Sequence, residues 1–187
     1  DGKGNFTDKT NELSQGLHYA GMITDAIATD LNKDGLSDLV IAGEWMPLQA
    51  WINHSGKLRD ETSQWFPYAN NGWWNTLEVN DVDNDGDVDL IVGNAGTNNQ
   101  FGVSEKHPAT MIFKDFNFDG QVDPYLCYFI NGVSYPYASR DEALGQVSFL
   151  KPRFPDYLSY ANATLDKIFT RGELQDTVML KASELRT

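Results

Sequence analysis

Acidic and amide side chains recur at one fixed spacing in three windows of the chain. Each window has Asp or Asn at its first, third, fifth and ninth positions and Gly at its sixth. The windows are 30–38, 81–89 and 115–123. Oxygen-bearing side chains at alternate positions around a glycine are the pattern expected of a loop that binds a hard cation.

Calcium is the cation that this pattern fits best. Ca²⁺ takes about six to eight oxygen ligands, and a tight loop turns alternate side chains toward one point. The glycine lets the backbone turn, so that the carbonyl of the seventh residue faces the ion. The sequence therefore predicts three Ca²⁺ sites. Their ligands are the residues at positions one, three, five, seven and nine: Asp30, Asn32, Asp34, Leu36, Asp38, Asp81, Asp83, Asp85, Asp87, Asp89, Asp115, Asn117, Asp119, Gln121 and Asp123.

Solvated turns are the alternative to cation loops, because Asp, Asn and Gly also dominate ordinary hairpins. Turns do not require one spacing in three copies, so we favour cation binding. An EF-hand loop does not fit, since it needs a Glu at position twelve and a following helix. Position twelve holds Ile41, Val92 and Leu126, and each window runs into β-branched or aromatic residues. The loops are therefore expected to join strands.

The first two windows belong to an internal repeat. Asp30 aligns with Asp81 and Leu39 with Leu90, both at an offset of 51 residues. A period of roughly 40 to 50 residues with several short strands is typical of propeller blades. In the first copy we expect strands at about 24–30, 37–43, 47–53 and 57–62. The second copy starts near Trp73 but is shortened or irregular, because too few residues separate the second and third windows for four strands.

Beyond the second copy, the composition predicts a loop, a hairpin and then helices. Residues 94–108 are rich in Asn and Gly and indicate a loop, and 109–137 indicate a hairpin around the third window. Ser139 to Glu142 form a capping box, and apolar residues follow at helical spacing up to Pro152. A second helical stripe is expected from Tyr157 to Ile168 and is ended by Gly172.

These residues resemble the FG-GAP and VCBS repeats, the cation-binding blades of integrin α-subunit propellers and of many bacterial cell-envelope proteins. The resemblance rests on the three windows, the trailing strands 38–43 and 89–94, Gly72–Asn75 and Tyr135–Glu142. It spans about residues 1–142 and is greatest to the bacterial branch related to cartilage acidic protein. It implies an integrin α-like repeat protein with β-propeller blades and calcium at the loop positions given above. Members of the family include adhesins and receptors.

We therefore expect a mainly β fold, a partial propeller with calcium-binding hairpin loops and a C-terminal helical insertion. The chain is predicted to be a single fragment, 1–187. Blades and loops occupy about 1–136, the helical insertion 137–172, and the start of a next strand 173–187. Asp1 begins inside a repeated pattern and no signal peptide is visible, so we expect a piece of a longer protein.

Composition restricts the partners. The net charge is −13 and the isoelectric point is near 4.4, the wrong sign for nucleic acid or anionic lipid. No apolar run is long enough to insert in a membrane. Cys127 is the only cysteine, which excludes an internal disulfide and a thiolate zinc cluster. Expected partners are a protein or glycan ligand, the remaining blades of a larger chain, or self-association through open sheet edges.

Catalytic patterns are weak. His18, His54 and His107 form no zinc or metalloprotease pattern, and Ser148–Lys151 lacks the companion motifs of penicillin-binding enzymes. Carboxylates outside the loops that could serve a glycosidase form no evident pair; they are Glu44, Glu78, Asp141 and Glu142. The five tryptophans are expected mainly in blade cores, with an exposed binding role as the alternative.

Three functions are consistent with the sequence. The favoured one is a calcium-stabilised, non-catalytic interaction module, placed outside the cell or in the cell envelope because millimolar Ca²⁺ is found there. The alternatives are the scaffold portion of a carbohydrate-active enzyme and a purely structural spacer of a larger surface protein. Whether the protein is an enzyme stays open at this point, with a non-catalytic role favoured.

Overall fold

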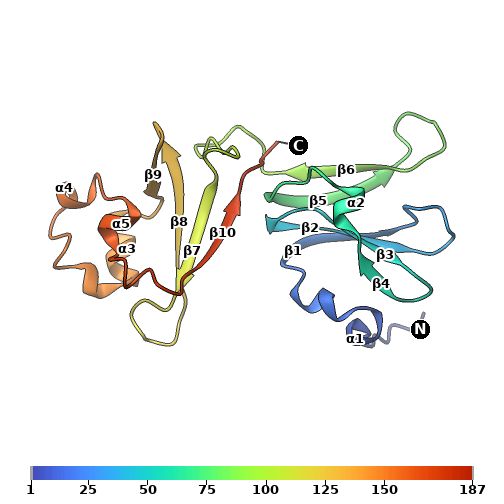
Figure 1. Ribbon diagram of the computed structural model, residues 1–187, viewed down its shortest axis with the longest axis horizontal. Coiled ribbons are helices and arrows are strands. Elements are labelled where there is room, and N and C mark those ends of the chain that lie inside the picture. Colours follow the sequence, from blue (N-terminus) through green and yellow to red (C-terminus); the bar gives the residue numbers. More distant parts are fainter. Residues whose placement is uncertain (1, 187) are drawn as a thin grey trace. The chain divides into compact units, whose positions relative to one another are not determined.

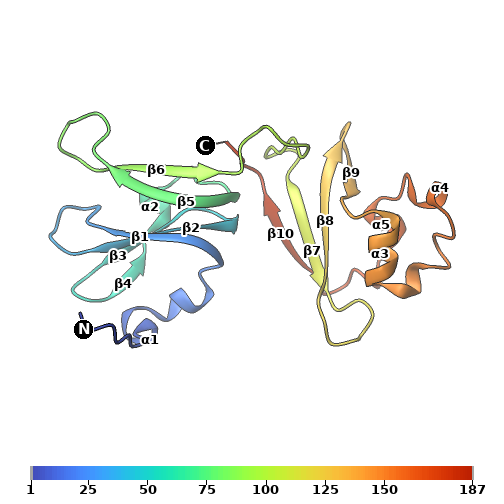
Figure 2. The ribbon, with the colours of Figure 1, turned by 180° about the vertical axis from the view of Figure 1, so that it is seen from behind.

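The structure is a computed structural model that describes residues 2–186 (Figures 1 and 2). The chain divides into two compact units, one of residues 2–96 with 185–186 and one of residues Thr97–Glu184. The buried residues within 2–186 gather in three separate clusters. Each unit is mainly β, in agreement with the predicted fold class.

The first unit begins with a four-stranded antiparallel meander. Its strands are β1 (Met22–Thr29), β2 (Asp38–Met46), β3 (Gln49–Asn53) and β4 (Leu58–Asp60), and each pairs with the next. All four strands predicted for the first repeat are therefore present. Two short helices precede the meander, α1 (Thr10–Leu13) and the 3₁₀-helix η1 (Gln15–Tyr19), and α2 (Thr62–Trp65) follows it.

The second repeat has two strands. They are β5 (Gly72–Asn80) and β6 (Asp89–Asn94), which pair antiparallel around the second window. β5 also pairs with the end of β2, where Glu44 lies opposite Trp73. The shortening predicted for this repeat is thus present.

Strand β2 is buried on both faces, which explains its nearly continuous apolar sequence. Side chains alternate along a strand, so Val40 and Ala42 lie on one face and Ile41 on the other. Val40 and Ala42 pack with Trp74 and Leu77 of β5 in one cluster. On the opposite face, Ile41 packs in a cluster with Ala20, Met46 and Trp51. The two repeats of the first unit therefore share a packed interface.

The second unit contains a four-stranded antiparallel sheet in the order β10-β7-β8-β9. Strands β7 (Ala109–Lys114), β8 (Asp123–Ile130) and β9 (Val133–Pro136) form the hairpin predicted around the third window. Residues 95–108 form no strand, as expected of the loop predicted there. A strand is present near the C-terminal end as β10 (Val178–Ala182), but it pairs with β7 and so completes the sheet of the third window.

Helices cover one face of this sheet (Figures 1 and 2). Helix α3 (Arg140–Gln146) starts with the predicted capping box and is followed by the 3₁₀-helix η2 (Ser148–Leu150). The cluster beneath them combines strand and helix residues: Ile112, Phe116, Tyr125, Ala143, Leu144, Val147, Leu150, Phe154, Tyr160, Ala163, Ile168 and Phe169.

The second predicted helix is wrong as one continuous element. Two single-turn helices stand in its place, α4 (Tyr157–Tyr160) and α5 (Leu165–Ile168). Tyr157, expected on the buried stripe, is 66% exposed, whereas Ala163 between the two helices is buried. Residues 161–164 between α4 and α5 are not helical, and Tyr160, Ala163 and Ile168 are buried in one cluster.

Across residues 2–186, the helices are all too short or too polar to cross a membrane.

Candidate cation-binding loops

The three windows form loops with one shared backbone conformation. They join β1 to β2, β5 to β6 and β7 to β8. The fourth residue of each loop has a left-handed φ near 60°, and these residues are Lys33, Asn84 and Phe118. The glycine at position six also has a positive φ, between 85° and 91°. This second left-handed turn is the reason for the glycine, because other residues rarely adopt it.

The carboxylate at the first position accepts two backbone hydrogen bonds from its own loop. The N–H of the fifth residue donates to one oxygen at 3.1 Å in all three loops. The N–H of the glycine donates to the other oxygen at 2.9–3.1 Å. The first-position residues Asp30, Asp81 and Asp115 are therefore held at the centre of their turns.

The third and fifth side chains are held in the same way. The N–H of the fifth residue also donates to the side-chain oxygen of the third, at 2.9–3.2 Å. The N–H of the seventh residue donates to the carboxylate of the fifth at 2.8 Å in each loop. The side chains at positions one, three and five therefore accept the same set of backbone hydrogen bonds in all three loops.

The ninth position closes each loop from the following strand. The N–H of the second residue donates to its carboxylate at 2.9 Å in all three loops. Asp38 and Asp123 are buried, and Asp89 is partly buried. Asp38 accepts a further bond from the N–H of Asn53 on β3 at 2.8 Å. Backbone donors offset part of the cost of burying these charged groups.

The second loop brings three carboxylates together. One oxygen each from Asp81, Asp83 and Asp89 lies within 4.8 Å of the others, close enough to bind one ion. Among residues 2–186, no other three His, Cys, Asp or Glu side chains meet this criterion. Asp85 and Asp87 stay outside the group. In the first and third loops an amide, Asn32 or Asn117, stands where the second loop has Asp83.

The seventh-position residues, Leu36, Asp87 and Gln121, are exposed. They were predicted to contribute only their backbone carbonyls. The side chain of Asp87 instead accepts a hydrogen bond from the ammonium group of Lys33 in the first loop. This bond raises the pKa of Lys33. The two loops of the first unit are thus joined by an ion pair. Sequence reasoning missed it, because no local pattern links Lys33 of one loop to Asp87 of the next.

Asp25 is a second residue whose role was missed. Its carboxylate accepts the backbone N–H of Leu77 at 2.7 Å and so ties β1 to β5. That hydrogen bond, followed by the one from Ala26, lowers the pKa of Asp25. One sequence signal could have indicated Asp25, because it aligns with Thr76 at the repeat offset of 51 residues. The Thr76 hydroxyl also donates a hydrogen bond to Asp25.

Two of the carboxylates considered for catalysis have structural partners. Glu142 accepts bonds from the N–H and hydroxyl of Ser139 at the start of α3, which lower its pKa. Asp141 accepts bonds from Arg140 and from the hydroxyl of Tyr157. Both carboxylates therefore take part in local hydrogen bonds at the start of α3.

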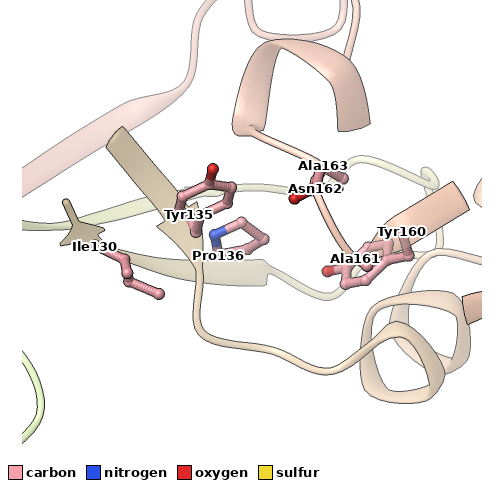
Figure 3. A pocket seen from close by; sticks show the side chains of 7 residues that line it. All are labelled: Ile130, Tyr135, Pro136, Tyr160, Ala161, Asn162 and Ala163. Atoms are coloured by element: carbon pink, nitrogen blue, oxygen red, sulfur yellow. The ribbon is translucent and has the colours of Figure 1, made fainter. Parts of the chain in front are cut away.

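A pocket of about 350 Å³ lies in the second unit, between the β8–β9 hairpin and the segment from α4 to α5 (Figure 3). Its lining is Ile130, Tyr135, Pro136 and residues 160–163. Because no carboxylate is among these residues, the pocket offers neither a cation site nor glycosidase acids. The hydroxyl of Tyr160 is bonded to the carbonyl of Ala138.

Comparison with known families matches residues 30–92 to the FG-GAP-like repeat. The match begins with the first loop and includes the second loop and most of β6. Searches of curated proteins and of solved structures give no match. The finer resemblance to a bacterial branch and to VCBS repeats stays a prediction. Family match, internal repeat and shared loop geometry agree for the first two loops, and residues 30–92 therefore form an FG-GAP-like repeat segment.

Proposed function

We propose that this protein is a non-catalytic interaction module whose hairpin loops are stabilised by Ca²⁺, and that it acts outside the cell or in the cell envelope. The observation that carries the proposal is the common loop geometry. In three separate hairpins, backbone N–H groups donate to the side chains at positions one, three and nine in the same pattern. In the second hairpin, one oxygen from each of these three positions lies within 4.8 Å of the others.

The acidic second loop supports calcium rather than simple turn formation. A turn gains nothing from three carboxylates whose oxygens lie within 4.8 Å, because like charges repel at that distance. A divalent ion converts the repulsion into attraction. Ca²⁺ accepts such irregular, oxygen-rich shells, whereas Mg²⁺ needs a smaller octahedral one.

The expected stabilisation is moderate for each ion. With a Kd near 10⁻⁴ M, typical of extracellular modules, about 1 mM Ca²⁺ adds roughly 1.4 kcal/mol per site. FG-GAP repeat proteins are typically extracellular, where calcium reaches such concentrations. A role in binding other protein regions or a glycan follows from the repeat class and not from a catalytic group.

The first test is a thermal melt of the whole chain with and without EDTA. We expect chelation to lower the melting temperature by several degrees. Added Ca²⁺ should restore it fully and added Mg²⁺ only poorly. A melting temperature unchanged by EDTA would contradict the proposal.

The second test asks whether Ca²⁺ binds at the second loop, and it uses the substitution Asp83→Asn. An amide at position three already accepts the same backbone bond in the first and third loops, so the loop should keep its shape. Only a charge is lost, and the Kd of this site for Ca²⁺ should rise on the order of tenfold. Isothermal titration measures it. Glu78→Gln is the matched control, because it removes an exposed carboxylate from the same hairpin outside the loop; equal effects of the two variants would argue for bulk charge alone.

A further inference from the structure

The pocket between the β8–β9 hairpin and the segment from α4 to α5 lies entirely within the second unit (Figure 3). Its volume of about 350 Å³ falls within the range of small-molecule sites, roughly 300–1,000 Å³. Tyr160 and Ala163 form part of its wall and also belong to the buried cluster beneath the helices. The pocket is therefore built on packed side chains and has a size that suits a small ligand.

Two polar side chains of the lining are available for hydrogen bonds to a ligand. Neither the hydroxyl of Tyr135 nor the carboxamide of Asn162 has a hydrogen-bond partner within residues 2–186. The hydroxyl of Tyr160, in contrast, donates to the carbonyl of Ala138 at 3.1 Å. Figure 3 shows Tyr135 on β9 and Asn162 on the segment between α4 and α5, so the two groups come from different sides of the pocket.

The lining of the pocket contains no charged side chain, although the chain as a whole has a net charge of −13. Lys167 is not in the lining, and its ammonium group donates to the backbone carbonyl of Asn162 at 3.1 Å. An acidic ligand would be repelled by the overall charge. A basic ligand would find no carboxylate in the lining. The pocket therefore favours a neutral ligand.

A sugar ring has the neutral groups that this lining can bind. The ring of Tyr135 is partly buried and can pack against the apolar C–H face of a pyranose, because aromatic faces carry partial negative charge. The carboxamide of Asn162 has both an acceptor and donors, which matches a pair of neighbouring hydroxyls. One aromatic face and one carboxamide thus provide stacking and orientation for a single ring.

A peptide added along β9 is the competing occupant, because strand edges accept extended chains. The N–H of Tyr137 points to β8, where it donates to the carbonyl of Leu126 at 2.7 Å. Successive backbone amides alternate between the two sides of a strand, so the nitrogen of Pro136 lies on the outer edge of β9. Pro136 has no N–H, and the edge therefore lacks a donor at the pocket.

We propose that this pocket is a glycan subsite that takes one neutral pyranose ring, stacked on Tyr135 and hydrogen-bonded by Asn162. The inference rests on the proposed interaction function and names the class of its ligand. It does not require calcium at the third loop. That loop precedes β8 at Asp123, whereas the pocket lies at the opposite end of the strand, at Ile130.

Chemical-shift titration of the ¹⁵N-labelled full chain tests the proposal. The probes are the methyl glycosides of glucose, galactose, mannose and N-acetylglucosamine. We expect at least one of them to bind with a Kd on the order of 1–10 mM, as suits a ligand of this size. Binding should shift the side-chain amide signals of Asn162 and the backbone signals of Ala161 and Ala163. Methyl glucuronide, which adds a carboxylate to the glucoside, should bind more weakly than the glucoside.

Three substitutions separate the roles of the two side chains. Tyr135→Leu removes the ring and Asn162→Ala removes the carboxamide, and each should raise the Kd about five- to tenfold. Tyr135→Phe keeps the ring and should raise the Kd less than Tyr135→Leu does. Tyr68→Leu is the matched control, because Tyr68 is 92% exposed in the first unit. It should leave the Kd unchanged.

Several outcomes would overturn the glycan subsite. They are an absence of shifts at the pocket with all the neutral glycosides, equal effects of Tyr135→Leu and Tyr68→Leu, and glucuronide binding as tight as that of the glucoside. Equal or tighter binding of the capped residue N-acetylalanine N-methylamide would assign the pocket to peptides instead.

Repeating the titration in EDTA separates this proposal from the calcium proposal. Sugar binding that persists while the melting temperature is unchanged by EDTA would refute the calcium role and keep the glycan subsite. A melting temperature that depends on calcium, without sugar binding in either condition, would refute the subsite alone.

Discussion

At the scale of single residues, the shape of each loop depends on the backbone N–H groups that donate hydrogen bonds to its carboxylates. Asp38 is fully buried, yet its two oxygens accept the N–H groups of Leu31 and Asn53. The local spacing predicted three loops of one shape, and the ligand set that it predicts stays a prediction. It gave no sign of Asn53, which reaches the first loop from β3. Nor did it predict that Trp51 and Trp74 would be buried in two different clusters, with Trp65 left 36% exposed. The burial of Trp45, Trp51 and Trp74 agrees with the expected preference for blade cores.

One residue pair predicts a pH dependence. Arg153 donates two hydrogen bonds to Glu173 at 2.7 and 2.8 Å, which lower the Glu173 pKa to about 2. A carboxylate with a depressed folded pKa stabilises the protein above its unfolded pKa, and this stabilisation is lost as the pH falls toward 2. Because the pair is partly exposed, we expect about 1 kcal/mol. The free energy of unfolding, measured with urea, should decrease less steeply between pH 5 and about pH 2 for Glu173→Gln than for the parent protein. Parallel curves would show that the pair contributes nothing.

At the scale of elements, local patterns were predictive where a segment pairs with its neighbour in sequence. The four strands of the first repeat and the capping box of α3 follow from alternation and capping chemistry. Two features could not be predicted. β10 pairs with β7 across the whole helical segment, which no local pattern encodes. The stripe from Tyr157 to Ile168 fits a helix by period, but burial of Ala163 breaks it.

The loop turn makes a prediction with an internal control. Gly120 and Gly145 both have open space where a Cβ would stand, but only Gly120 has a positive φ, of 88°. Gly120→Ala should destabilise the second unit by about 1–2 kcal/mol through the left-handed backbone. Gly145→Ala lies in α3 and should be stabilising by up to about 1 kcal/mol. Denaturant midpoints measure both; the same sign for the two variants would show that steric space and not backbone conformation governs them.

At the scale of the whole molecule, charge is the dominant feature. The net charge of −13 is concentrated in loops that share a backbone but lie in two different units, the first two in one and the third in the other. Three Ca²⁺ ions would bring six positive charges to them. The partition into two units was not predicted, because three copies of one loop suggest one continuous array. The prediction of a single 1–187 propeller fragment therefore remains untested as a description of the intact architecture.

Screening of the loop carboxylates by salt should replace part of the stabilisation that bound Ca²⁺ provides. Sodium chloride shortens the range of repulsion between exposed carboxylates. The melting temperature of the EDTA-treated protein should therefore rise by several degrees between about 0.02 and 0.5 M NaCl. That of the calcium-loaded protein should change much less. Equal salt responses in the two states would mean that loop repulsion does not limit stability.

Because Gly96 and Leu185 lie within hydrogen-bond distance, the first unit should tolerate a different domain inserted between them. A segment whose two ends meet within hydrogen-bond distance can be exchanged for another folded domain without stretching the host. Residues 97–184 are thus inserted at a site whose two ends are adjacent. A reporter domain with neighbouring termini, spliced between these two positions, should leave the two repeats of the first unit able to fold.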